Sequence, residues 1–197
     1  MRVGSRFKGI RINKRGSIGV GNIRGSSGGS GLVGTTWNPD AKNALVTLTN
    51  NNLTASDTDI DAVVRSIKSQ TTGKYYAEMK LDNLGSGLTV GLANGAASLN
   101  SAPGFPVGTT SYNSNTAIYV NGSFIGAGPS VVTNDVIGII YNGNTKMYWM
   151  SKNGVLFAGD PVAGIGGYNI SAITGAIFLV CSSAGGTNYT KRWKFSI

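Results

Sequence analysis

The sequence predicts an all-β protein, an antiparallel two-sheet β-sandwich, on three observations. Short apolar runs recur from about residue 35 onward and are separated by segments rich in Thr, Ser, Asn and Gly. The pair Asn-Gly, which accepts the positive φ angles of tight hairpins, begins at Asn94, Asn121, Asn142 and Asn153. No amphipathic helical pattern runs longer than about two turns. Evenly spaced short strands with turn signals are typical of a sandwich or barrel.

Individual strands follow from the period of the apolar residues. Residues 74–81 alternate, with Tyr75, Ala77, Met79 and Leu81 on one face. The runs 136–140 and 176–180 are apolar without alternation, which predicts strands covered on both faces. Residues 61–68 fit either a short helix or a strand. Strands are predicted near residues 44–48, 74–81, 88–93, 117–121, 135–141, 146–151 and 176–181.

Charge divides the chain into two regions. Residues 1–34 hold seven basic side chains and no acid, whereas the rest of the chain holds ten basic and eight acidic ones. Glycine interrupts this first segment every few residues, and residues 25–31 have the composition of a flexible linker. We therefore predict an extended basic N-terminal arm over residues 1–34 and one sandwich domain over residues 35–197.

The arm is predicted to be an assembly anchor that lies on a partner subunit. Its charges would face an acidic surface, and small apolar residues would add contacts. Exposed ion pairs contribute only about 0–1 kcal/mol each, so backbone hydrogen bonds to the partner are also expected. Binding of nucleic acid by a basic tail is the rival hypothesis, and we rank it second. The predicted anchor residues are Arg2, Arg6, Phe7, Lys8, Arg11, Lys14, Arg15 and Arg24.

Composition argues against several function classes. The chain has no histidine, which excludes Ser-His-Asp and Cys-His catalysis and histidine-based zinc sites. Its one cysteine, Cys181, sits in an apolar run and is interpreted as a buried core residue. No apolar stretch reaches about 18 residues, so we expect no membrane insertion. We predict no catalytic residue, no cofactor and no cofactor-binding site.

Carboxylates gather in one place. Asp57, Asp59 and Asp61 alternate, so on a strand they would share a face. A calcium ion is one explanation and a solvated edge is the other, favoured because the EF-hand pattern is incomplete. We therefore assign no metal site and leave a bound cation open. On a strand Glu78 and Asp82 would lie about 13 Å apart, too far for a glycosidase pair.

Aromatic residues suggest a binding surface. Tyr112, Tyr119 and Tyr168 stand among Ser, Asn and Gly, as do Trp37 and Tyr141, and this mixture resembles loop-based binding surfaces. We predict that Tyr112, Tyr119 and Tyr168 form such a surface; burial of some of these rings in the core is the alternative. Residues 191–195 interleave bases with aromatics, and their alternation favours a closing strand over a nucleic-acid site.

Several segments resemble, in order, the motifs of SPRY (B30.2-like) domains. The matches cover about residues 45–197, although Asn134 replaces the family's usual glycine and the segment 94–116 is long. The resemblance implies a bent, lectin-like (concanavalin A-like) jelly roll that binds proteins through its loops. The matching segments are Gly73-Lys74-Tyr75-Tyr76-Ala77-Glu78, Val90-Gly91-Leu92-Ala93, Asn134-Asp135-Val136-Ile137-Gly138, Lys152-Asn153-Gly154 and Trp193-Lys194-Phe195.

A basic arm on a SPRY-like sandwich with few charges resembles a bacteriophage virion protein. We accordingly expect a non-enzymatic structural protein located in the virion. Its arm would anchor it to capsid or tail subunits, and its loops would serve decoration or host contact. The alternatives are a soluble SPRY-type adaptor that binds a peptide, and a carbohydrate-binding, lectin-like module.

Overall fold

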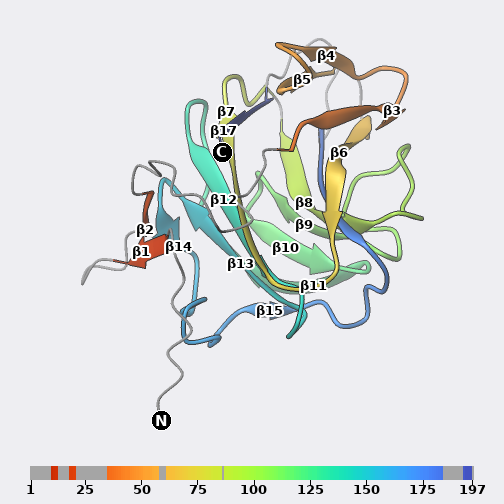
Figure 1. Cartoon of the computed structure of the whole chain (residues 1–197). Helices are drawn as coiled ribbons and strands as arrows, with labels where there is room; N and C mark the ends of the chain where they lie inside the picture. Colours follow the sequence, from red (N-terminus) through yellow and green to blue (C-terminus); the bar gives the residue numbers. More distant parts are fainter. Residues whose placement is uncertain are drawn as a thin grey trace, which may run out of the picture.

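The computed structural model is an antiparallel two-sheet β-sandwich (Figure 1). Every regular element among the described residues is a strand, so the predicted fold class is confirmed. No helix in this part of the chain is long and apolar enough to cross a membrane. The structure describes residues 35–57, 61–85 and 87–182, and the backbone alone of residues 10–12, 18–20, 183 and 193–196.

One sheet has seven strands, all paired antiparallel to their neighbours. Its two central strands, β8 and β16, pair over seven residues, from Leu88 opposite Ser183 to Asn94 opposite Ile177. In spatial order the strands are β11 (Ser123–Ala127), β10 (Ala117–Val120), β9 (Thr110–Asn113), β8 (Leu88–Asn94), β16 (Ile177–Ser183), β6 (Val63–Gln70) and β3 (Trp37–Lys42).

The other large sheet has eight strands, again antiparallel. In its interior strand β12, Ile140 lies between Tyr76 of β7 on one side and Trp149 of β13 on the other. In order the strands are β14 (Val155–Leu156), β13 (Met147–Lys152), β12 (Val136–Asn142), β7 (Lys74–Leu81), β17 (Trp193–Ser196), β5 (Thr54–Ser56) and β4 (Thr47–Thr49), and β15 (Tyr168–Asn169) pairs with β13. A separate hairpin consists of β1 (Ile10–Ile12) and β2 (Ile18–Val20).

The main core fills the space between the two large sheets. Buried side chains come from both sheets, including Leu88 and Tyr112 from the first and Ile137 and Tyr148 from the second. Smaller clusters cover the outer faces: Ile140 and Trp149 on the eight-stranded sheet, with others on the seven-stranded sheet. The central strands are therefore buried on both faces, as the unbroken apolar runs predicted.

The Asn-Gly pairs serve two structural purposes. Asn121 (φ 49°) and Asn153 (φ 50°) are followed by glycines at φ 82° and 79°, the left-handed pair that a type I′ hairpin requires. Asn94 and Asn142 have no positive φ. Their side-chain oxygens instead accept backbone hydrogen bonds, from Ala96 N for Asn94 and from the N–H two residues on for Asn142.

Most predicted strands are confirmed, two segments differ from expectation, and one ambiguous segment is resolved. The run 44–48 becomes a strand only at Thr47–Thr49, because Leu45 lies in a turn and is exposed. Of the ambiguous residues 61–68, which fitted a helix or a strand, residues 63–68 belong to β6, whose partners lie in the sheet on both sides. The segment 94–116, expected to be a loop, contains β9, and the closing segment 193–196 forms β17 as expected.

Candidate partner-binding site

Among the described residues, the most exposed phenylalanine side chains lie at one edge of the seven-stranded sheet. These side chains come from two segments, the loop 102–109 and the β10–β11 hairpin that follows it. Phe105 and Phe124 are 51% and 61% exposed, and Val107 beside Phe105 is 81% exposed. We call Phe105, Tyr119 and Phe124, with Val107 and Ile125, the aromatic patch. Contiguous exposed apolar surface of this kind marks interaction sites in soluble proteins.

The loop is held on the hairpin by backbone and side-chain hydrogen bonds. Gly122 N donates to Gly104 O (2.6 Å), and Asn121 N donates to Thr109 O (2.9 Å). The Asn121 side chain accepts from Gly108 N at 2.8 Å, and Thr109 Oγ1 accepts from Gly104 N at 2.7 Å. Loop and hairpin therefore form one unit.

Gly104 is required for the loop to lie this close. Its φ is 92°, and a Cβ there would lie 2.0 Å from Ser111 Oγ and 3.1 Å from Tyr119 Cβ. Any other side chain would push the loop away from the sheet. The loop glycine thus places the Phe105 ring over the hairpin, next to Tyr119.

The Tyr119 ring contacts both of the other rings of the patch. The centroids of Phe105 and Tyr119 are 4.9 Å apart, and those of Tyr119 and Phe124 are 5.9 Å apart at an interplanar angle of 71°. These separations lie within the range for favourable aromatic pairs. The patch is therefore ordered before any partner arrives, which reduces the entropy lost on binding.

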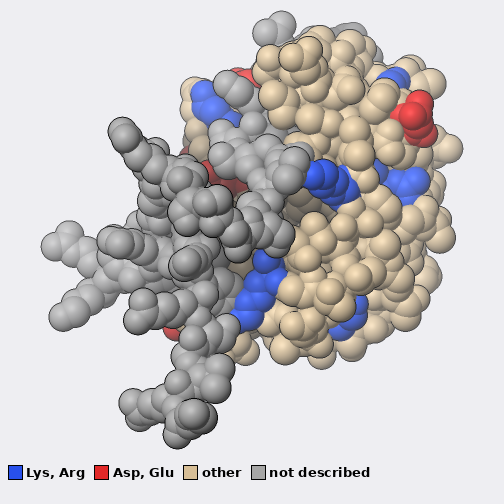
Figure 2. All heavy atoms as spheres, in the orientation of Figure 1, with Lys and Arg blue, Asp and Glu red and all other residues tan. Residues whose placement is uncertain are grey.

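The sequence around the patch carries no charge. Between Asp82 and Asp135 there is no Asp, Glu, Lys or Arg. This neutral segment, residues 83–134, includes β8 to β11 and the whole patch. On the face seen in Figure 2 the charged side chains are scattered among broad neutral areas. The patch therefore offers apolar side chains, with backbone and hydroxyl groups as its polar groups.

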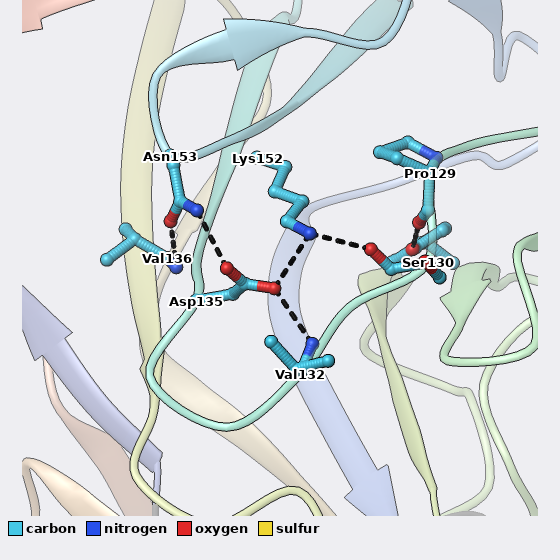
Figure 3. Close-up of polar contacts among 8 residues, drawn as sticks. Pro129, Ser130, Val132, Asp135, Val136, Lys152 and Asn153 are labelled. Carbon is cyan, nitrogen blue, oxygen red and sulfur yellow. Dashed lines mark hydrogen bonds and ion pairs between the residues drawn. The ribbon is translucent and has the colours of Figure 1, made fainter.

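The chain leaving the hairpin is fastened to the opposite sheet. The Tyr112 hydroxyl, from β9 in the hairpin's own sheet, donates to Pro129 O. Lys152 Nζ, at the end of β13, donates to Ser130 O at 2.8 Å and pairs with Asp135 Oδ2 at 3.0 Å. Figure 3 shows Lys152 pointing between Asp135 and Ser130. The hairpin is thereby tied to β13.

Asp135 is the centre of this polar cluster. Its Oδ2 accepts from Val132 N (2.8 Å), and its Oδ1 accepts from Asn153 Nδ2 (2.7 Å), as drawn in Figure 3. Burial alone would raise the pKa of its carboxyl. The bonds from Val132 and Asn153 and the Lys152 ammonium outweigh burial and hold the pKa below its ordinary value. The cluster is structural, because each of its polar groups bonds another group of the cluster.

The three predicted surface tyrosines have different positions. Tyr119 lies in the patch and is half-buried. Tyr168 is half-buried against Tyr148, with centroids 5.3 Å apart, and its ring borders Gly126 of β11. Placing Tyr112 on the binding surface was wrong. It is fully buried in β9, packs edge-on against Phe157, and belongs to the core.

Trp37 and Tyr141 are also buried, at 0% and 3% exposure. The predicted anchor residues of the arm lie outside the described residues, except that the backbone of Arg11 belongs to β1. Their role stays a prediction.

The carboxylates form no reactive group in the described part of the chain. Asp57 is buried, Asp61 is partly exposed with φ 64°, and Asp59 lies outside the described residues. No group of three potential metal ligands occurs among the residues that are described. Glu78 accepts a hydrogen bond from Tyr76, and Asp82 pairs with Lys80 at 3.4 Å on the surface.

Solved structures similar to this chain include two SPRY domains. The SPRY domain of human HERC1 has a TM-score of 0.67 and 12% identity, covering 81% of this chain and 96% of its own. The TRIM65 PSpry domain has a TM-score of 0.62 and 12% identity, covering 83% and 92%. Stonustoxin has a TM-score of 0.59 and 11% identity over 82% of this chain and 27% of its own. No family model and no curated protein matches in sequence. The fold is therefore that of SPRY domains.

Phe105 and Phe124 were not among the predicted surface residues, which were all tyrosines. The available signal was the uncharged stretch 83–134, in which Phe105 follows Gly104 and Phe124 lies two residues after Gly122.

Proposed function

We propose that this chain is a non-enzymatic protein-binding module of the SPRY type, which holds its partner at the aromatic patch. The exposed rings of Phe105 and Phe124, both packed on the half-buried Tyr119 within the uncharged stretch 83–134, carry this proposal. Rigid aromatic side chains dominate binding energy at protein interfaces. The SPRY fold supports the same class of function.

A test of the binding site compares three full-length proteins in affinity capture with quantitative mass spectrometry. They are the native chain, the double variant Phe105→Ser/Phe124→Ser, and the control Ile67→Ser. Ile67 is 50% exposed and lies on β6, five strands from β11 in the same sheet. We expect a partner that the native protein and the control both capture and the double variant loses. Equal capture by all three contradicts the proposal.

The biological setting that we propose is the bacteriophage virion. In it the basic arm, residues 1–34, anchors the protein to capsid or tail subunits, and the patch contacts a further virion or host-surface protein. The seven charges of the arm and the near neutrality of the rest of the chain support this division, since the two regions suit different partners. Nucleic acid is the less favoured partner of the arm.

The virion proposal has its own test. Particles are purified from cells that produce either the full chain or a chain without residues 1–34, and the protein is quantified per particle. We expect a fixed stoichiometry for the full chain and loss of incorporation without the arm. Normal incorporation of the shortened chain contradicts the anchor, and recovery in the soluble fraction alone supports the adaptor hypothesis instead.

A further inference from the structure

The outermost strand of the patch, β11, is the least protected sheet edge in the described structure. The opposite edge of its sheet, β3, has the sequence WNPDAK and contains a proline and two charges. The edges of the other large sheet are β14, with two residues, and β4, with three. Prolines, charges and short length are the usual means of blocking strand addition. β11 has five residues, SFIGA, with no charge and no proline.

Backbone groups of β11 face this open edge. The Asn121-Gly122 turn makes Val120 and Ser123 a hydrogen-bonded pair, so the next pair, Tyr119 and Phe124, is not hydrogen-bonded. The N–H and C=O of Phe124 therefore point away from β10. Gly128 N donates to Thr116 O at 2.8 Å, so Gly128 and Thr116 form a hydrogen-bonded pair. The N–H and C=O of the preceding residue, Ala127, therefore also point away from β10.

The edge is not a fully regular ladder. A β-bulge between Ile118 and Tyr119 leaves Ile125 as an extra residue on β11. The bulge limits how long a regular added strand can be, and it leaves both Phe124 and Ile125 exposed, at 61% and 39%. Backbone groups on each side of the bulge remain available to a short segment.

Charge complementarity defines what such a segment must be. An added strand would lie beside Phe124 and Ile125, within the stretch 83–134 that has no charged residue. A charged side chain placed there would lose water and gain no ion pair, which is unfavourable. The basic arm of a second copy is excluded on the same ground, because it carries seven charges in 34 residues.

We infer that the partner contributes a short, extended, uncharged segment that pairs with β11 as an added strand and rests its apolar side chains on the aromatic patch. The inference depends on the proposed function and specifies how the patch is used. Main-chain hydrogen bonds supply affinity in this mode, and side-chain contacts supply specificity. Because no ion pair forms, binding is independent of salt concentration.

The experiment uses the full chain and a library of random short peptides as the probe. Selected peptides are measured against the native protein, Ala127→Pro, Ala127→Ser and Phe124→Lys. Ala127→Pro removes an outward-facing N–H and no patch side chain, and Ala127→Ser is its matched control. We expect uncharged, apolar peptides whose affinity does not change with salt. Ala127→Pro weakens binding by roughly fivefold or more, the equivalent of one backbone hydrogen bond. Phe124→Lys abolishes binding, and thermal unfolding confirms that each variant is folded.

The other outcomes separate the two proposals. If Ala127→Pro binds like Ala127→Ser while Phe124→Lys does not bind, the patch is a partner site without strand addition, and only this inference fails. Charged peptides with salt-dependent affinity overturn it as well. A concentration-dependent dimer that Ala127→Pro abolishes assigns the edge to a second copy and also overturns it. If neither change affects peptide binding, or no peptide is selected, the proposed function fails too.

Discussion

The Lys152 ammonium lies 3.0 Å from the Asp135 carboxylate and joins the end of β13 to the segment that leaves the β10–β11 hairpin. Asp135 is buried and accepts two further hydrogen bonds, so this pair differs from ordinary surface ion pairs. Removal of one partner leaves the other groups unsatisfied, which is more damaging than loss of an exposed pair.

Asp135→Asn should lower the free energy of unfolding at neutral pH by about 1–3 kcal/mol. The pKa of Asp135 is lower in the folded protein than in the unfolded chain. Its contribution is therefore complete above about pH 4 and disappears as the pH falls through the folded-state pKa. Denaturant unfolding of the native protein and variant over this pH range measures the difference.

The control for this prediction is Asp82→Asn, which removes the exposed pair with Lys80. Exposed pairs contribute about 0–1 kcal/mol, so this variant should stay close to the native protein at every pH. Equal, pH-independent effects of the two substitutions would show that the Asp135 cluster does not stabilise the fold.

Gly91→Ala should destabilise the sandwich by about 1–3 kcal/mol, the usual range for overpacking. A Cβ at Gly91 would lie 2.2 Å from the backbone oxygen of Thr110, whose hydroxyl also accepts from Leu92 N. The matched control is Gly95→Ala, where the nearest atom is 3.6 Å away on the Phe178 ring. The denaturant midpoint of unfolding measures the effect of each substitution. Similar midpoints for the two variants would contradict the close approach of β8 and β9.

Cys181 should not react with thiol reagents while the protein is folded. The side chain is 1% exposed, and burial, aided by the negative charge of Asp57, raises the pKa of its thiol well above the ordinary value. Labelling at mildly alkaline pH should begin only when denaturant unfolds the chain. Rapid labelling of the native protein would mean that the strand β16 is open to solvent.

Substitutions of the patch aromatics and of the core aromatics should differ in their effect on stability. Phe105→Ser and Phe124→Ser remove exposed rings and should change the free energy of unfolding by no more than about 1 kcal/mol. Tyr112→Ala removes a buried ring and should cost about 3–5 kcal/mol. Thermal and chemical unfolding measure both effects, and a small loss of stability in Tyr112→Ala would contradict the burial of the Tyr112 ring.

The fold could be predicted from the sequence where the local pattern of apolar residues agrees with the burial of the strand in the folded protein. The period-two run in β7 placed Met79 and Leu81 on one face, where both are buried, and the unbroken apolar run of β12 matches the burial of that strand. β9 escaped prediction because its sequence, TSYN, is polar although all four residues are buried. Its Thr110 and Tyr112 side chains enter a core that only the second sheet creates, and no local pattern reports this.

The residues of the candidate site were only partly predictable from the sequence. Of the predicted surface tyrosines, Tyr119 is half-buried beside Phe105, whereas Tyr112 alternates with it across the sheet and faces inward. Which face a strand residue occupies depends on register, and register is a tertiary property. The pairing of Phe105 with Tyr119 depends on how the loop folds back, which Gly104 determines through its left-handed backbone.

The most direct test of partner binding at the aromatic patch is site-specific photocrosslinking in the full-length protein. A photoreactive phenylalanine analogue replaces Phe105 in one sample and the exposed Ile67 in another. Each is incubated with intact particles or host cell surfaces and irradiated, and the adducts are resolved by mass. We predict a single discrete protein adduct from position 105 and none from position 67. Adducts in equal yield from both positions, or none from position 105, would contradict binding at the patch.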